Sequence, residues 1–194
     1  NGGANSMLYP PANDPFVVTV GASDMKGTAT RLDDGMAPWS SYGTTQDGFN
    51  KPDVVAPGRV MAAPIAYPDA TLVTQDRIVD PNRRYFWLSG TSMSAPVVAG
   101  GAALIFQVRP ELTNDQVKWL LMNTAFVLTS NGSTLPGQGA GLIDAARAVN
   151  FRSRVQFANQ GLTPSSLLVV ANGSTNYSSA NWSTANWSTS TTLR

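Results

Sequence analysis

Apolar positions gather into short runs separated by turn residues, with one long apolar segment near the middle of the chain. That segment, residues 97–108, follows the small and hydroxyl residues 88–96 in a pattern that predicts a buried helix. The helix is expected to end at Arg109-Pro110, because proline cannot continue it. The β-branched run Val17 to Val20 and the pair Val54-Val55 each predict a short buried strand. Short strands alternating with helices predict an α/β domain with a largely parallel sheet.

Two further helices are predicted after Pro110. Thr113 and Gln116 form a capping-box pattern, and apolar side chains recur after it on one helical face. The glycine-rich turn that begins at Gly137 enters a short helix. Before the central helix, residues 59–87 are expected to be a charged surface loop. They end in the aromatic run 85–87, expected to be a strand packed in the core.

Composition narrows the function classes. Charged residues make up 13% of the chain and the net charge is +1, which argues against nucleic acid or an anionic membrane as the main partner. The sequence has no apolar run of the length that a membrane span needs, so none is predicted. Cysteine is absent, which excludes disulfides and thiolate metal sites. Histidine is absent as well, and this removes the most frequent general base.

Ser92 is the candidate nucleophile. It stands at the predicted N-terminus of the central helix, where backbone N–H groups and the helix dipole stabilise a developing anion. Gly90 gives the chain freedom to turn just before it. From the residues alone, Thr91, Ser92 and Ser94 are better explained as ordinary N-cap residues of a core helix, which is what most such clusters are.

The run Gly90-Thr91-Ser92-Met93-Ser94-Ala95-Pro96 resembles the nucleophile motif of the subtilisin-like serine proteases, the subtilases. This resemblance implies that Ser92 is the nucleophile. The opening Asn1-Gly2-Gly3 resembles the family's oxyanion loop, which implies that Asn1 donates a side-chain hydrogen bond to the oxyanion. The residues implied to contact substrate lie around these two motifs: Gly2, Gly3, Leu88, Ser89, Gly90, Thr91 and Met93.

The resemblance also implies a fold, the subtilisin-like three-layer sandwich, of which this chain would supply the C-terminal part. It covers residues 1–150, the expected portion of the catalytic domain. Residues 151–194 are expected to be a C-terminal extension that carries Asn-Trp/Tyr-Ser repeats between 175 and 189. The repeat predicts a low-complexity extension, with carbohydrate or cell-wall binding as the alternative.

A subtilase also needs an Asp–His pair upstream of the oxyanion residue. Because the chain has no histidine, we expect a missing N-terminal portion of the same protease to supply both residues. The alternatives are a pseudoprotease with a binding or structural role, and a chance match by another α/β protein. The position after Pro96, often histidine in the family, is Val97.

The remaining expectations concern ligands and location. The resemblance implies polypeptide substrates, an extracellular location and chemistry that needs no cofactor. Structural calcium is frequent in the family, but Asp53 has no clustered acidic partner in the sequence. We therefore assign no metal residue.

Overall fold

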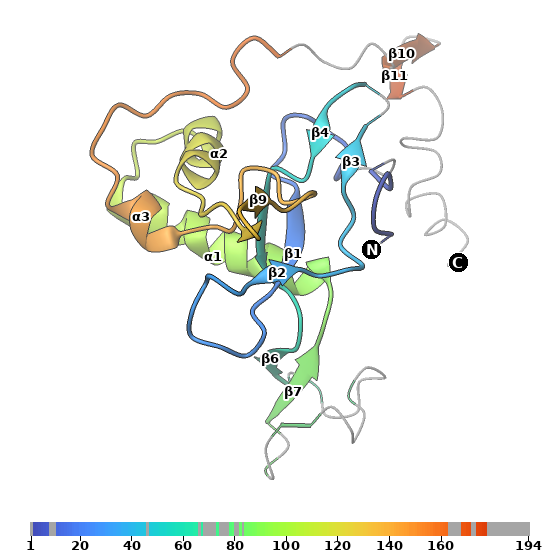
Figure 1. Cartoon of the computed structure of the whole chain (residues 1–194). Coiled ribbons are helices and arrows are strands. Elements are labelled where there is room, and N and C mark those ends of the chain that lie inside the picture. Colours follow the sequence, from blue (N-terminus) through green and yellow to red (C-terminus); the bar gives the residue numbers. More distant parts are fainter. Residues whose placement is uncertain are drawn as a thin grey trace.

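The centre of the molecule is a three-stranded sheet with helices packed against it (Figure 1). The computed structural model describes residues 2–7, 11–45, 47–65, 67, 73, 78–79, 82 and 84–162, and the backbone of 168–171 and 174–177. Strand β1 (Val20–Asp24) lies between β2 (Gly35–Met36), which is antiparallel to it, and β5 (Val54–Pro57), which is parallel. The parallel pair starts at Val20 opposite Val54 and ends at Ser23 opposite Pro57.

The free edge of β5 is paired by a later part of the chain. Val55 donates its N–H to the Gly141 carbonyl at 2.9 Å and accepts from Ile143 at 3.0 Å. Residues 141–143 therefore continue the parallel order of β1 and β5, although they form only an isolated bridge. This central parallel pairing agrees with the predicted α/β class.

Three helices follow the sheet. Helix α1 (Thr91–Val108) contacts β1 and β5, and α2 (Asn114–Asn123) and α3 (Ala145–Val149) pack on α1 (Figure 1). The helix predicted to end at Arg109-Pro110 is confirmed, with Arg109 as its C-cap. The capping box of α2 is also confirmed, because Thr113 accepts from the Gln116 N–H and Gln116 accepts from the Thr113 N–H.

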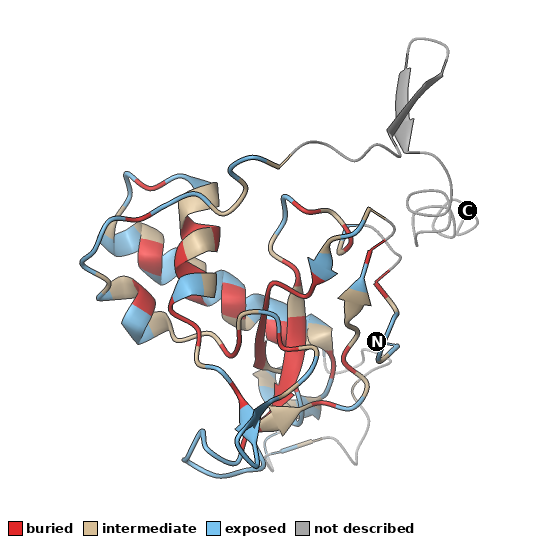
Figure 2. Cartoon of the chain, turned by 45° about the horizontal axis from the view of Figure 1, so that its top comes forward, coloured by how far each residue is buried: buried red, intermediate tan, exposed pale blue. Residues whose placement is uncertain are grey.

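Buried residues lie mainly where the sheet meets the helices (Figure 2). The α1 face that packs on the sheet presents Ser94, Val98, Gly101 and Ile105, at the spacing of one helical face. The main core joins these elements to α2, α3 and the segment that follows α3, through Val54, Ala56, Val98, Ile105, Leu112, Val117, Leu120, Leu121, Ala148 and Val155.

Within the described residues, α1 alone is long and apolar enough to cross a membrane by length and composition. A core helix passes the same test, and α1 makes the contacts of one, against β1, β5, α2 and α3. The described part of the chain therefore gives only weak evidence against the prediction of no membrane span.

The other described strands form short antiparallel pairs. These are β3 (Gly43–Thr44) with β4 (Asn50–Lys51), β6 (Met61–Pro64) with β7 (Tyr85–Leu88), β8 (Thr129–Ser130) with β9 (Ser133–Thr134), and β10 (Leu168–Ala171) with β11 (Ser174–Tyr177).

Two predictions about strands were wrong in part. The run Val17 to Val20 was expected to be a strand, but β1 begins only at Val20. Pro52 precedes β5, the strand that pairs with β1, and proline has no N–H to extend the hydrogen-bond ladder towards Val17. Residues 85–87 do form a strand, as predicted, but β7 is not packed in the core: Trp87 is 41% exposed, because β7 pairs only with β6 among the described strands.

Some predictions fall outside the described residues. Asn1 is one of them, and of the Asn-Trp/Tyr-Ser repeats only Thr175–Tyr177 is described, as part of β11. The division of the chain near residue 150 stays a prediction.

Candidate active site

Ser92 is exposed in the first turn of α1. Gly90 is the N-cap, and no side chain caps this end of the helix. The first turn contains no acidic residue. An anion that reaches this end of the helix therefore meets backbone N–H groups and the positive end of the dipole, with no side-chain carboxylate in the turn to repel it.

The end of β5 holds this turn in place. Gly90 donates its N–H to the Gly58 carbonyl at 2.8 Å, and Gly58 donates to the Ser23 carbonyl of β1 at 3.1 Å. Ser94, which is fully buried, donates its hydroxyl to the Ala56 carbonyl of β5 at 3.0 Å. The N-terminus of α1 is thus fixed to two strands of the central sheet.

Gly58 is glycine because there is no room for a side chain. A Cβ on Gly58 would overlap the Ser94 hydroxyl and would lie 2.8 Å from the Ala22 Cβ and 2.9 Å from the Gly90 carbonyl oxygen. The backbone of β5 can therefore approach the start of α1 only with glycine at this position.

The residues before Ser92 come from β7. Leu88 pairs with Met61 of β6, and Ser89 accepts a hydrogen bond from the Val60 N–H through its hydroxyl at 2.8 Å. Gly90, Thr91 and half-buried Met93 complete the turn. The candidate residues 88–93 are consecutive and form one segment, which we call the Ser92 segment: Leu88, Ser89, Gly90, Thr91, Ser92 and Met93.

Gly2 and Gly3 belong to a separate loop. Gly2 donates its N–H to the Ser41 hydroxyl at 2.7 Å, and the Gly3 carbonyl accepts from the Tyr42 N–H at 3.0 Å. These bonds fix the glycine loop against residues 41–42, so Gly2 and Gly3 are anchored independently of the Ser92 segment. Asn1 is not among the described residues.

Asp53, considered as a metal ligand from the sequence, is engaged in ion pairs. Its carboxylate accepts from Lys51 at 2.8 Å and from the Thr19 N–H at 2.6 Å, and lies 3.5 Å from the Lys118 ammonium. All three charged side chains are buried. Within the described ranges, no group of three or more His, Cys, Asp and Glu residues is arranged to hold a metal ion.

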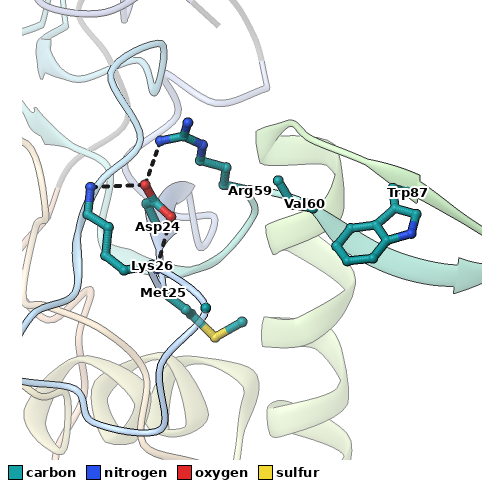
Figure 3. A pocket seen from close by; sticks show the side chains of 7 residues that line it. Asp24, Met25, Lys26, Arg59, Val60 and Trp87 are labelled. Atoms are coloured by element: carbon teal, nitrogen blue, oxygen red, sulfur yellow. Dashed lines mark hydrogen bonds and ion pairs between the residues drawn. The ribbon is translucent and has the colours of Figure 1, made fainter. Parts of the chain in front are cut away.

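Sequence reasoning missed a charged cluster next to the Ser92 segment. Asp24, at the end of β1, binds Arg59 at 2.6 Å and Lys26 at 3.1 Å (Figure 3). Burial raises the pKa of Asp24, but hydrogen bonds from the Lys26 N–H, the Lys26 ammonium and Arg59 outweigh it, so the pKa lies below its usual value. Val60 and Trp87 stand beside this cluster and line a hollow with it (Figure 3).

The cluster left no signal in the sequence, because its members come from two separate segments. Arg59 reaches Asp24 only through the parallel register in which Ser23 lies opposite Pro57. In the sequence alone, Asp24 and Arg59 each resemble the isolated charged residues of ordinary surface loops.

The sequence is similar to known proteases over most of its length. The protein-family model described as "Subtilase family" matches residues 1–142. Serine protease AprX of Bacillus subtilis (strain 168) is 39% identical over 141 residues, which cover 72% of this chain and 32% of AprX. Subtilisin BL of Lederbergia lenta is 36% identical over 148 residues, which cover 76% of this chain and 43% of that protein. The chain thus spans less than half of the length of these curated relatives.

Solved structures give the same result. Fervidolysin from Fervidobacterium pennivorans, described as a keratinolytic enzyme related to subtilisin, aligns with a TM-score of 0.57 and 29% identity over 74% of this chain and 20% of its own. A protease from Pseudoalteromonas arctica aligns with a TM-score of 0.53 and 33% identity over 75% of this chain and 39% of its own. These matches confirm the subtilisin-like α/β fold predicted from the sequence, and the chain belongs to the subtilase family.

Proposed function

We propose that this chain carries the nucleophile of a serine endopeptidase, and that the nucleophile is Ser92. The observation that carries the proposal is the exposed Ser92 hydroxyl in an uncapped first helical turn, within a subtilase-family sequence. Ser92 Oγ attacks the carbonyl carbon of the scissile peptide bond while its proton passes to a histidine. That histidine returns the proton to the leaving amine, and water then hydrolyses the acyl-enzyme.

The oxyanion of the tetrahedral intermediate is stabilised from two sides. Backbone N–H groups at the start of α1 donate from one side, supported by the absence of a capping side chain there. The amide of Asn1 donates from the other. Its assignment rests on the resemblance of the Asn1-Gly2-Gly3 loop to the family's oxyanion loop.

The general base and its aspartate come from an N-terminal portion of the same protease. The absence of histidine from these 194 residues supports this, as does the greater length of the relatives. An open apolar groove of about 290 Å³ between α1 and α2, lined by Val20, Ala99 and Phe106 among others, offers such a portion a surface. Two further apolar side chains of α1, Leu104 and Val108, are exposed.

This partner requirement predicts that the 194-residue chain expressed alone is poorly soluble or unfolded, because the apolar side of α1 then faces water. Calorimetry or circular dichroism of the chain without any partner tests it. A cooperative thermal transition under these conditions would contradict the proposed need for the N-terminal portion.

The substrates are polypeptides, and the reaction needs no cofactor. An extracellular location is part of the proposal, by analogy with the subtilisins among the relatives. The second candidate function is that of a pseudoprotease, which fits the absence of histidine from the chain as well. In that case the fold serves binding or assembly without hydrolysis.

Labelling with a fluorophosphonate probe, mapped by peptide mass spectrometry, tests the function. We expect labelling at Ser92 in the natural source material and none in the chain alone. Ser92→Ala abolishes the labelling, whereas the control variant Ser130→Ala, which removes an exposed hydroxyl in β8, keeps it. No labelling in the source material would sink the protease assignment and favour the pseudoprotease.

A further inference from the structure

Two hollows in the surface meet beside the Ser92 segment. The smaller, of about 240 Å³, is lined by Val60, Trp87, Leu88 and Ser89, and so begins three residues before Ser92. The larger, of about 550 Å³, shares Val60 and Trp87 with it and continues to Arg59, Lys26 and Asp24. We call the two together the Arg59 groove.

The charged end of this groove presents cations to solvent. The Asp24 side chain is only 9% exposed, whereas Lys26 is 49% and Arg59 is 47% exposed. Asp24 accepts from the Lys26 N–H through one oxygen and from both cations through the other, so both of its oxygens are already engaged. Among the residues that line the groove, two exposed cations face one buried anion, so an incoming carboxylate meets mainly positive charge. Asp34, whose carboxylate interacts with that of Asp24, is buried and does not line the groove.

The cations are also held in position. Because Asp24 binds Arg59 through one nitrogen, the guanidinium keeps further donors for a ligand. In Figure 3 the Asp24 carboxylate lies between Arg59 and Lys26, with Val60 between Arg59 and Trp87. A preorganised guanidinium loses less side-chain freedom on binding a carboxylate than a free one does.

Apolar side chains line the rest of the groove. Trp87 and Val60 are both exposed, and Met25 is exposed at the charged end. Exposed aromatic and aliphatic side chains next to a cation suit a peptide that places apolar groups before an acidic one. The aromatic residue that sequence reasoning assigned to the core thus lies on the groove.

The distance from Ser92 to Arg59 fits a short peptide. Arg59 directly follows Gly58, whose carbonyl accepts the Gly90 N–H at 2.8 Å, and Gly90 is two residues before Ser92. Adding these steps places the two Cα atoms within about 18 Å of each other, a span that roughly five extended residues can cover.

We propose that Arg59 and Lys26 select polypeptide substrates with an acidic side chain about three to five residues from the scissile bond. This inference rests on the proposed function, because it assigns the groove to the substrate of Ser92. The neighbouring Trp87 and Val60 contact the apolar residues between the acidic side chain and the cleaved bond.

The test uses the active protease that contains this chain and a series of fluorescein-labelled decapeptides. Each peptide has a single Glu at one position, and its partner has Gln there. We expect kcat/KM to favour Glu over Gln by up to about fivefold at a position three to five residues from the cleaved bond, the effect of an exposed ion pair. Arg59→Gln and Lys26→Gln each lower this Glu/Gln ratio, and the double variant brings it to about one.

Arg154→Gln is the matched control, because it removes an exposed positive charge outside the groove. It leaves the Glu/Gln ratio unchanged. Raising the salt from about 0.05 M to about 0.5 M lowers the ratio in the wild-type protease and not in the double variant, since salt screens exposed charges. If the cluster only braces β1 against residue 59, the variants slow both peptides equally. That result, or no Glu preference at any position, overturns the inference.

Binding separates this failure from failure of the proposed function. The same peptides are titrated against the Ser92→Ala protein, followed by fluorescence anisotropy. One outcome is that no peptide is cleaved, but Glu peptides bind more tightly than Gln peptides, and only when Arg59 and Lys26 are present. In that case the groove binds acidic peptides as proposed, and the proposed hydrolytic function fails. Equal Kd values for Glu and Gln peptides overturn the groove, whether or not cleavage occurs.

Discussion

Replacing Gly58 by alanine tests whether the end of β5 positions the predicted nucleophile. The backbone of Gly58 does not lie in the left-handed region, so alanine is not strained by its own dihedral angles. The damage is steric: the new methyl group overlaps the Ser94 hydroxyl and lies 2.8 Å from the Ala22 Cβ. Both neighbours are fully buried and have no open space to move into.

The magnitude follows from these contacts. Overpacking of a close-packed core costs about 1–3 kcal/mol. Displacing Ser94 also weakens its hydrogen bond to the Ala56 carbonyl, which contributes about 1 kcal/mol. We therefore expect Gly58→Ala to lower the free energy of unfolding by about 2–4 kcal/mol. Because a shift of the α1 N-terminus moves Ser92, kcat should fall by about tenfold to a hundredfold.

Urea unfolding and fluorophosphonate labelling of the assembled protease measure the two effects. Gly35→Ala is the matched control, since Gly35 lies in β2 and a Cβ there meets only the flexible end of the Lys26 side chain, at 3.6 Å. Alanine there should change the free energy of unfolding by no more than about 0.5 kcal/mol. In a Ser94→Ala background the closest clash is gone, so Gly58→Ala should cost about 1–2 kcal/mol less than in the wild type. Unchanged stability and labelling in Gly58→Ala would refute the reasoning.

Three further predictions concern charge and oxidation. The hydrogen bond from Arg31 and, to a smaller extent, the α3 cap bond hold the pKa of Asp144 below its usual value. The ionised Asp144 therefore stabilises the fold above its unfolded-state pKa, and this stabilisation is lost as the pH falls through the folded-state pKa. Asp144→Asn, which keeps the cap, should lower the free energy of unfolding at neutral pH by up to about 1 kcal/mol, with urea unfolding showing a difference that narrows on acidification. Burial lowers the pKa of Lys118, so the free energy of unfolding should increase as the pH rises from the folded-state pKa of Lys118 towards its unfolded-state value of 10.5. Alkaline melts of the Lys118→Met variant should lack this increase. Oxidation of Met93 to the polar sulfoxide should lower kcat/KM of the assembled protease, and peroxide-treated Met93→Leu should keep its activity.

The helices were predictable because their signals are local. Pro110 stops α1 within one residue, and the capping box at Thr113 satisfies backbone groups at the start of α2. The Ser92 motif belongs to the same class, since its hydroxyl and its helix N-terminus lie in one continuous stretch. Such features need no knowledge of which distant segment packs where.

The errors arose where the neighbouring segment decides the outcome. An aromatic run such as residues 85–87 predicts a strand, but burial depends on whether another layer covers it, and Trp87 faces solvent. The start of β1 depends on where its partner can offer N–H groups, and Pro52 offers none. The Asp24–Arg59 pair exists only because β1 and β5 lie parallel in one register.

Helix α1 connects the stability of the chain to its proposed chemistry. One of its faces, with Val98 and Ile105, is buried against the sheet, while Leu104 and Val108 on other faces are exposed. A helix that is apolar all round is stable when it is buried on all sides. The N-terminal portion that would cover α1 is also the portion that would bring the histidine to Ser92. On this proposal, burial of the exposed apolar side of α1 and assembly of the catalytic triad are a single event, so the chain becomes stable and active together.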